Sequence, residues 1–184
     1  MRELPKQLNM QMATANVPPS EPGGSGIEVS PLGFRVISVQ DLTADVLKRS
    51  GIERGMRVLD LGCGSGDASL LIAEMAGPSG LVVGVDESAQ AIDEAEKRAT
   101  VAGRCYWMRF VRANPDTFVP PERFDAVVVR LSLLRQGEPA TFLRLSACVR
   151  PDGVIIVVSP AGQSQMPIRS LIEMGRLLSW ARGL

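Results

Sequence analysis

Histidine is absent from the sequence: none of the 184 residues is one. Imidazole titrates near neutral pH and serves widely as a general base and as a metal ligand. Any acid–base chemistry must therefore use carboxylates, lysines or the single tyrosine, Tyr106. None of these groups stands in a recognisable catalytic motif. Asp116 and Glu138 are expected in loops at the ligand-binding end of a sheet, but the sequence assigns no catalytic residue.

The chain is also poor in cysteine. Its three cysteines, Cys63, Cys105 and Cys148, lie far apart and form no CxxC pair. That spacing argues against a disulfide framework or a zinc site and fits a reducing compartment. No apolar run reaches the roughly 18 residues of a membrane span, and the N-terminus lacks the apolar core of a signal peptide. We expect a cytoplasmic protein with no membrane partner and no bound metal.

Charge of neither sign is in excess, because 20 Lys and Arg residues balance 20 Asp and Glu residues. An excess of basic residues is the usual mark of a nucleic-acid partner, so we expect none here. The apolar share of 45% is enough for a buried core, and the length suggests one domain.

The chain divides into three parts by composition. Residues 1–30 are rich in Pro, Gly and Ser, and we expect them to be disordered. Order is expected from about Phe34, in a domain over residues 34–160. Residues 161–184 contain a helical pattern of apolar side chains, which predicts a C-terminal helix.

Short apolar strands and helices alternate through the domain. The runs VVGV, AVVV and VIIVV lack polar alternation, which is typical of parallel strands buried on both faces. We predict a doubly wound, mostly parallel α/β sheet of about five strands with helices on both faces. The predicted strands are 56–61, 81–85, 106–111, 124–129 and 154–158, and the predicted helices are 40–50, 67–76, 88–102, 138–149 and 166–182. In the helix over 88–102, the residues Glu94, Glu96, Lys97 and Arg98 are expected to form a solvated face.

A glycine loop follows the first of these strands, in the stretch VLDLGCGSGD at residues 58–67. Three glycines in alternation allow the backbone to turn tightly and approach a ligand. The spacing is GxGxG, whereas the dinucleotide fingerprint is GxGxxG. Asp67 replaces the third glycine of that fingerprint and, with Asp60, is expected to repel a pyrophosphate. The loop therefore favours a ligand with a positive centre, and a nicotinamide enzyme is the less favoured interpretation.

At this point the sequence resembles the class I S-adenosylmethionine-dependent methyltransferases, and in particular bacterial methyltransferase-domain proteins. The resemblance rests on VLDLGCGSGDAS, VVGVDES, FVRANPDTF, FDAVVVRLSLL and VRPDGVIIVVS, which occur in the family's order between Gly51 and Ser159. It implies a Rossmann-like fold and S-adenosylmethionine as cofactor. It also implies transfer of a methyl group to a small-molecule acceptor that the sequence does not identify.

The resemblance also implies roles for individual residues. Asp60 is expected near the methionine amino group, and Asp86 is expected to accept hydrogen bonds from both ribose hydroxyls. Asn114 takes the place of the acid that meets adenine in the family, and Arg130 is expected to face the cleft. The full set of residues expected at the cofactor is Asp60, Gly62, Cys63, Gly64, Gly66, Asp86, Glu87, Ala113, Asn114 and Arg130.

The chain departs from the family after the fifth predicted strand. The family fold ends with an antiparallel pair of strands beside that strand, and 25 residues after Ser159 are too few for it. The chain is thus expected to be short at its C-terminus, with the edge of the strand VIIVV left unpaired. We expect the C-terminal segment or a partner subunit, in a homodimer, to cover that edge. A catalytically weak, cofactor-binding remnant is the alternative to an active enzyme.

Overall fold

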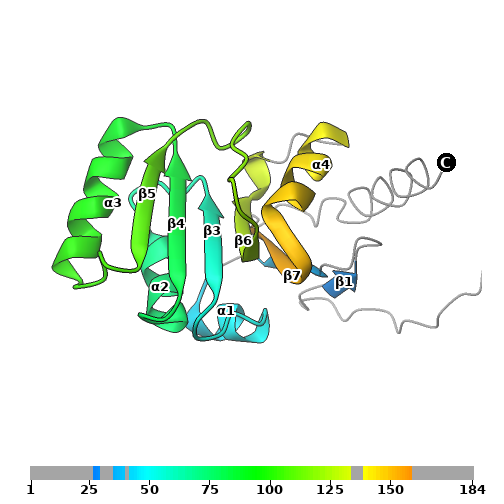
Figure 1. The fold of residues 1–184 in the computed structure, drawn as a ribbon, viewed down its shortest axis with the longest axis horizontal. Coiled ribbons are helices and arrows are strands. Elements are labelled where there is room, and N and C mark those ends of the chain that lie inside the picture. Colours follow the sequence, from blue (N-terminus) through cyan, green and yellow to red (C-terminus); the bar gives the residue numbers. More distant parts are fainter. Residues whose placement is uncertain (1–26, 30–34, 40–41, 134–138, 159–184) are drawn as a thin grey trace, which may run out of the picture.

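A seven-stranded sheet organises the residues that the computed structural model describes, which are 27–29, 35–39, 42–133 and 139–158. Six strands run parallel, and β1 runs antiparallel to β2 (Figure 1). In spatial order the strands are β1 (Ile27–Val29), β2 (Arg35–Val39), β7 (Val149–Val158), β6 (Phe124–Arg130), β3 (Arg57–Leu61), β4 (Leu81–Asp86) and β5 (Met108–Arg112).

Helices cover both faces of this sheet. One face packs against α1 (Ala44–Arg49), α2 (Asp67–Ala76) and α3 (Ala89–Val101), and the other packs against α4 (Pro139–Cys148). Side-chain caps start two of the helices, because the hydroxyls of Thr43 and Ser88 accept hydrogen bonds from backbone N–H groups of α1 and α3. A short 3-10 turn, Leu131–Leu133, follows β6. No helix in the described residues is long and apolar enough to cross a membrane.

The central part of the fold confirms the prediction from sequence. The five predicted strands are β3 to β7, and the three helices predicted between them, over 67–76, 88–102 and 138–149, are found within a few residues of their expected limits. The helix predicted over 40–50 is shorter, since α1 spans Ala44–Arg49. The strand predicted over 154–158 is longer and begins at Val149. The helix predicted over 166–182 lies outside the described residues.

The structure corrects two expectations, of which the first concerns the edge of β7. It is paired with β2, in parallel and in register from Arg35 with Val154 to Val39 with Val158. The chain itself therefore covers the edge that we expected the C-terminal segment or a partner subunit to cover. Ordered structure also begins earlier than predicted, because β1 lies within the stretch expected to be disordered.

Burial explains why this N-terminal segment adds to the sheet. The side chains of Val36, Ile37 and Val39 are almost completely buried, with Val36 in the core of one face and Ile37 and Val39 in that of the other. A strand that is apolar on both faces is stable only where both faces are covered. The sheet thus has seven strands rather than about five, and an antiparallel pair does lie beside β7, supplied by the N-terminal side of the chain.

We predict that Ile37→Ala lowers the free energy of unfolding by about 2–5 kcal/mol, because it leaves a cavity against β7. Hydrogen exchange of the β7 amides should become faster in this variant. Val101→Ala is the matched control, since Val101 is 90% exposed on α3 and its replacement should change stability by less than about 0.5 kcal/mol. Denaturant unfolding of both variants makes the comparison, and equal costs would contradict the pairing of β2 with β7.

Candidate functional site

The sequence-predicted site residues gather at the carboxyl edge of the sheet. Asp60 lies near the end of β3, Asp86 ends β4 and Arg130 ends β6, while Ala113 and Asn114 follow β5 directly. These four strands are parallel neighbours, so their carboxyl ends meet at one edge. The chain passes from β3 to β4 on one side and returns with β6 on the other. Ligands of open α/β sheets bind at such a reversal of strand order.

The loop between β3 and α2 has a backbone that only glycines adopt easily. Gly62, Gly64 and Gly66 all have positive φ angles, of 76°, 53° and 84°. A Cβ on Gly66 would come within 3.1 Å of the Ala95 Cβ on α3. This glycine, which precedes α2, therefore allows α2 and α3 to pack closely. A Cβ on Gly64 would have no atom within 4 Å. Gly64 is therefore the part of the loop that faces open space.

Four of the five backbone N–H groups between Gly62 and Gly66 are already used inside the protein. Those of Gly62 and Cys63 donate to the Val85 carbonyl, and that of Gly66 donates to the Cys63 carbonyl. The N–H of Gly64 donates to a carboxylate oxygen of Asp86, at 2.9 Å. A pyrophosphate cradle needs N–H groups that point at the ligand. Most of the loop's N–H groups are thus unavailable to such a ligand.

Asp86 is held in place by backbone donors on two sides. Its Oδ2 accepts from Gly64, and its Oδ1 accepts from the N–H of Ser88 at 3.0 Å. Each carboxylate oxygen has two lone pairs, so each retains the capacity to accept one further hydrogen bond. The side chain is partly exposed at the carboxyl edge of the sheet. Asp86 can therefore act as a fixed double acceptor.

Asp60 is the most unusual charged group of the site, because it is completely buried. Its Oδ2 accepts from the Ser69 hydroxyl of α2 at 2.6 Å, whereas its Oδ1 has no hydrogen-bond partner among the described residues. Burial raises the pKa of this carboxyl, against the opposing effects of the Ser69 hydrogen bond and the nearby Arg130. A buried acceptor without a donor is costly, and a cationic donor would relieve that cost. The sequence did not identify Ser69.

Cys63 contributes no thiol chemistry to the site. It is buried, and its sulfur packs close to Gly84 of β4, where a Cβ would come within 2.9 Å of it. Burial, together with Asp60 and Asp86, raises the pKa of the thiol to about 12. The thiolate is the nucleophilic form of cysteine, so this side chain serves as part of the core.

Asp67 corrects one argument drawn from the sequence. Its carboxylate forms an ion pair with Arg98 of α3, at 2.5 Å, and the hydrogen bond from Arg98 lowers the pKa of Asp67. Arg98 thus compensates much of the charge of Asp67, so the argument that Asp67 repels a pyrophosphate is weakened. Arg98 was also expected on a solvated face of its helix, but it contacts the loop. Nothing in the local pattern of α3 distinguishes it from its charged neighbours.

The remaining predicted residues lie at the rim of the site. The side-chain oxygen of Asn114 accepts from the N–H of Asp116 at 2.8 Å, so it also shapes the turn after β5. Glu87 is exposed, and its carbonyl accepts from Arg112 at 3.3 Å. Arg130 is partly buried close enough to Asp60 to affect its pKa.

The candidate general bases do not all lie at the same edge of the sheet. Tyr106 precedes β5 at the amino edge of the sheet and is 91% exposed, so it cannot serve a site at the carboxyl edge. Asp116 follows β5 at the carboxyl edge, and Glu138 lies outside the described residues. The described residues contain no cluster of three or more metal-ligating side chains.

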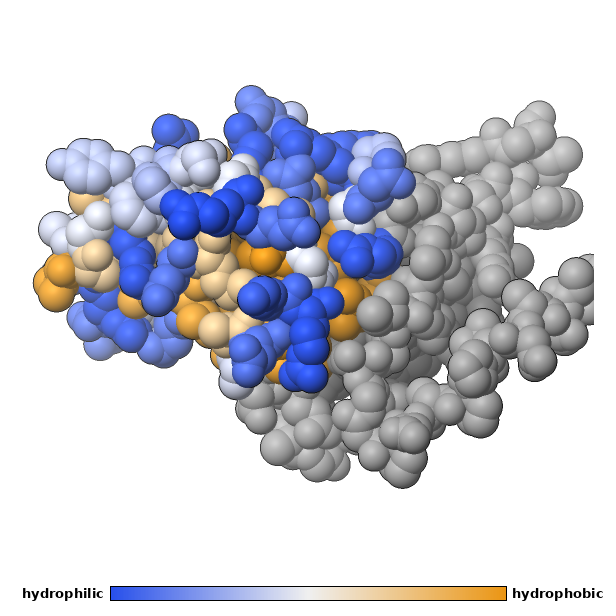
Figure 2. Space-filling view, turned by 90° about the horizontal axis from the view of Figure 1, so that it is seen from below, coloured by the Kyte–Doolittle hydropathy of each residue, from blue (hydrophilic) through white to orange (hydrophobic). Residues whose placement is uncertain are grey.

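A separate cavity of about 410 Å³ lies at the opposite, amino edge of the sheet. Figure 2 views the molecule from this side, where hydrophilic side chains make up much of the coloured surface. The charged residues that line the cavity balance in sign, and none of them belongs to the predicted site: Arg35, Arg54, Arg150, Glu53, Asp125 and Asp152. Arg150 and Asp125 already form an ion pair. The cavity therefore shows no preference for a ligand of either charge.

Comparison with known proteins shows which proteins the chain is similar to. A family model described as "Methyltransferase domain" matches residues 52–179. A probable cobalt-precorrin-6B C(15)-methyltransferase (decarboxylating) of Thermoplasma acidophilum is 35% identical over 104 residues, which are 56% of this chain and 48% of that protein. A 2-phytyl-1,4-naphtoquinone methyltransferase of Synechococcus elongatus is 34% identical over 135 residues, 73% of this chain and 58% of that one.

A solved structure agrees with these relatives. The chain resembles a SAM-dependent methyltransferase from Thiobacillus denitrificans, crystallised in complex with S-adenosyl-L-homocysteine, with a TM-score of 0.54 and 26% identity. The likeness covers 62% of this chain and 46% of that one. The chain thus spans about half the length of the relatives that it matches.

We predict that Asp60→Asn raises the melting temperature at neutral pH. Since burial raises the pKa of Asp60 in the folded state, its protonated form favours folding in acid, and that contribution is lost as pH rises through the raised pKa. The variant has no charge to bury, so its advantage should grow from acid to neutral pH in thermal scans. Asp67→Asn is the control, because the pKa of Asp67 is lowered and its replacement should bring no gain. A melting temperature unchanged at every pH in Asp60→Asn would contradict the burial of a charged Asp60.

Proposed function

Because the chain belongs to the family of methyltransferase domains, we propose that it binds S-adenosylmethionine at the carboxyl edge of the sheet and transfers its methyl group to a small molecule. The observation that carries the proposal is the buried Oδ1 of Asp60, which has no partner among the described residues, beside a glycine loop with four of its five N–H groups already bonded. A site with free acceptors and few free donors suits a ligand whose reactive part is cationic. The methionine end of this cofactor carries an ammonium group and a sulfonium.

The residues at this edge fit the cofactor group by group. Asp60 would accept from the methionine ammonium, which supplies the donor that its Oδ1 lacks within the described residues. Asp86 would accept from the ribose hydroxyls through its remaining lone pairs. Gly64 would allow the cofactor to approach the backbone, since no atom lies within 4 Å of the place of its Cβ. Asn114 would stand at the adenine, with Ala113 and Glu87 nearby at the same edge of the sheet.

The cofactor supplies an activated methyl group, and the protein supplies position and electrostatics. Asp60 and Asp86 would orient the cofactor, and Arg130 would sit near the buried carboxylate of Asp60 and favour its ionised form. The chain offers no histidine to remove a proton from the acceptor. An acceptor that is already nucleophilic, such as a carboxylate or a stabilised carbanion, suits such a site better than an alcohol. The relatives named for a precorrin and a naphthoquinone support an acceptor of small-molecule size.

We predict that calorimetric titration of the folded protein detects micromolar binding of both S-adenosylmethionine and S-adenosylhomocysteine. Asp60→Asn should weaken binding by about 10- to 150-fold, since a hydrogen bond to a charged group contributes about 1.5–3 kcal/mol. The same variant is expected to be more stable than the parent at neutral pH, so its loss of affinity cannot be ascribed to unfolding. Absence of binding by the folded parent protein would contradict the proposed function.

We expect Asp86→Asn to weaken binding by a similar factor, because an amide presents one acceptor oxygen where the carboxylate presents two. The amide also leaves the N–H of either Gly64 or Ser88 without its acceptor. Asp93→Asn is the matched control, because Asp93 is an exposed aspartate on α3. Calorimetry of the two variants tests the placement of the ribose, and equal affinities would contradict it.

A further inference from the structure

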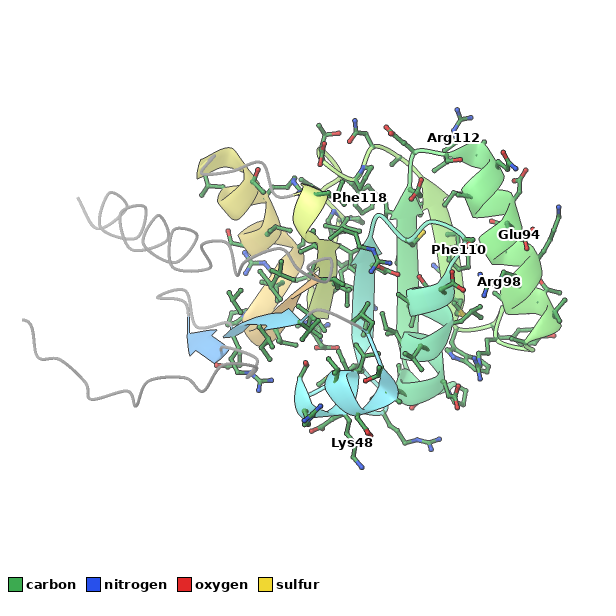
Figure 3. All side chains as sticks on the ribbon, turned by 180° about the vertical axis from the view of Figure 1, so that it is seen from behind. Lys48, Glu94, Arg98, Phe110, Arg112 and Phe118 are labelled. Atoms are coloured by element: carbon green, nitrogen blue, oxygen red, sulfur yellow. The ribbon has the colours of Figure 1, made fainter. Side chains whose placement is uncertain are left out.

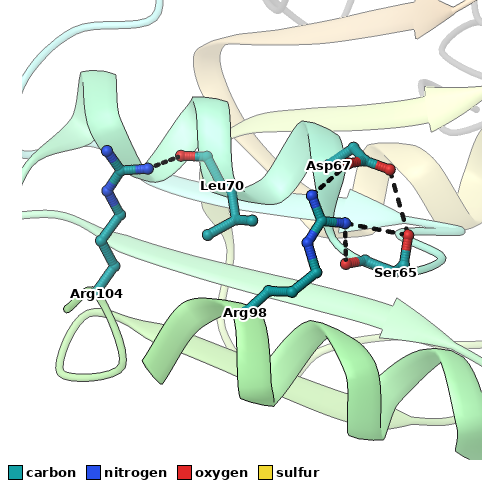
Figure 4. Close-up of polar contacts among 5 residues, drawn as sticks. All are labelled: Ser65, Asp67, Leu70, Arg98 and Arg104. Atoms are coloured by element: carbon teal, nitrogen blue, oxygen red, sulfur yellow. Dashed lines mark hydrogen bonds and ion pairs between the residues drawn. The ribbon is translucent and has the colours of Figure 1, made fainter. Parts of the chain in front are cut away.

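Arg98 connects α3 to the glycine loop through three hydrogen bonds. Its Nη1 donates to the Ser65 carbonyl at 2.9 Å and to the Ser65 hydroxyl at 3.3 Å, and its Nη2 donates to Asp67 at 2.5 Å. The Ser65 hydroxyl in turn lies 3.2 Å from the other oxygen of Asp67. Figure 4 shows the resulting closed ring of contacts, and Figure 3 shows Arg98 among the labelled residues of α3.

Packing holds the loop at Cys63 and Gly66, which are buried, but not at Gly64 between them, and a restraint is needed there. Three of the five residues between Leu61 and Asp67 are glycines, which have the largest conformational freedom to lose on ordering. Nothing packs against Gly64 at the place of its missing side chain. Asp86 fixes the loop on the β4 side through the Gly64 N–H, and Arg98 fixes it on the α3 side through the next residue, Ser65.

We propose that Arg98 is a positioning residue that holds the glycine loop in its cofactor-binding shape before the cofactor arrives. It acts through the Ser65 carbonyl and is not itself placed among the cofactor contacts. This inference rests on the proposed function for its effect on affinity. Its effect on the loop concerns the free protein and is measurable without any cofactor.

The physical basis is preorganisation. A ligand binds only the competent shape of a loop, so its apparent affinity falls with the population of that shape. The ion pair is partly exposed, with 35% of the Arg98 side chain and 78% of the Asp67 side chain accessible, so solvent screens its charge. We therefore expect Arg98 to matter more to the local order of the loop than to the stability of the whole domain.

The chain offers a close control in Arg104. Its Nη1 donates to the Leu70 carbonyl at 3.1 Å, as Figure 4 shows. Its Nη2 donates to Glu74 at 3.1 Å, so Arg104 contacts α2 through one carbonyl and one carboxylate. These contacts lie farther along α2 and do not touch the loop. A general loss of packing between α2 and its neighbours affects both arginines, whereas positioning of the loop depends on Arg98 alone.

The test compares Arg98→Met, Arg98→Lys and Arg104→Met. We expect Arg98→Met to raise the Kd for S-adenosylhomocysteine on the order of tenfold, and to speed hydrogen exchange of the Gly64 and Gly66 amides in the free protein. Arg98→Lys should recover part of the affinity, because an ammonium reaches one of the two acceptors but does not hold both in a fixed fork. Arg104→Met should leave the Kd and the loop amides as in the parent, whatever its effect on the melting temperature.

A further variant, Arg98→Met with Asp67→Asn, distinguishes positioning from neutralisation of Asp67. We expect it to bind as weakly as Arg98→Met alone, and recovery of affinity would show that neutralisation is the role of Arg98. The inference is also overturned if Arg98→Met and Arg104→Met weaken binding equally, or if Arg98→Met leaves loop exchange unchanged. Failure of the parent protein to bind S-adenosylhomocysteine would count against the proposed function, and exchange of the loop amides would still decide the role of Arg98.

Discussion

The hydrogen bond from the Gly64 N–H to the Asp86 carboxylate is the contact on which the site depends. It joins the most open residue of the loop to the end of the neighbouring strand, at 2.9 Å. The start of the loop is joined to β4 by the N–H groups of Gly62 and Cys63, and this bond extends the attachment to Gly64, the open middle of the loop. With it, the carboxylate is oriented by the loop, and the loop is oriented by the carboxylate. Two neighbouring parallel strands thereby define one binding edge.

Asp60 shows how the site conflicts with the stability of its own domain. A completely buried carboxylate with one unpartnered oxygen opposes folding when it is ionised. Replacement of that oxygen by an apolar group would suit the core better, yet would remove the acceptor that a cationic ligand requires. Departures of this kind from good packing are expected where a protein binds or reacts. The surrounding sheet is apolar on both faces, and so it tolerates the cost.

The parts that could be predicted from sequence are those encoded locally. The strands β3, β4 and β6 are short apolar runs, and the glycine loop has its spacing written in consecutive residues. The pairing of β2 with β7 could not be predicted, because it joins Arg35 to Val154 across more than a hundred residues. Arg98 was missed for the same reason: its partners lie 31 and 33 residues away, and its helix position resembles any exposed charge.

The donors of the loop explain the choice of cofactor better than its acids do. Asp67 looked decisive in the sequence, but Arg98 compensates its charge. What distinguishes the loop is that four of its five N–H groups donate to Val85, Cys63 and Asp86 and so are not available to phosphate oxygens. A GxGxxG turn places such groups at a pyrophosphate. Here the acceptor without a partner among the described residues is the buried Asp60 Oδ1, and an acceptor of this kind favours a cation. The proposed preference for a cationic ligand over a pyrophosphate therefore rests on which backbone N–H groups are already bonded in the folded protein. The spacing of the glycines alone only suggests it.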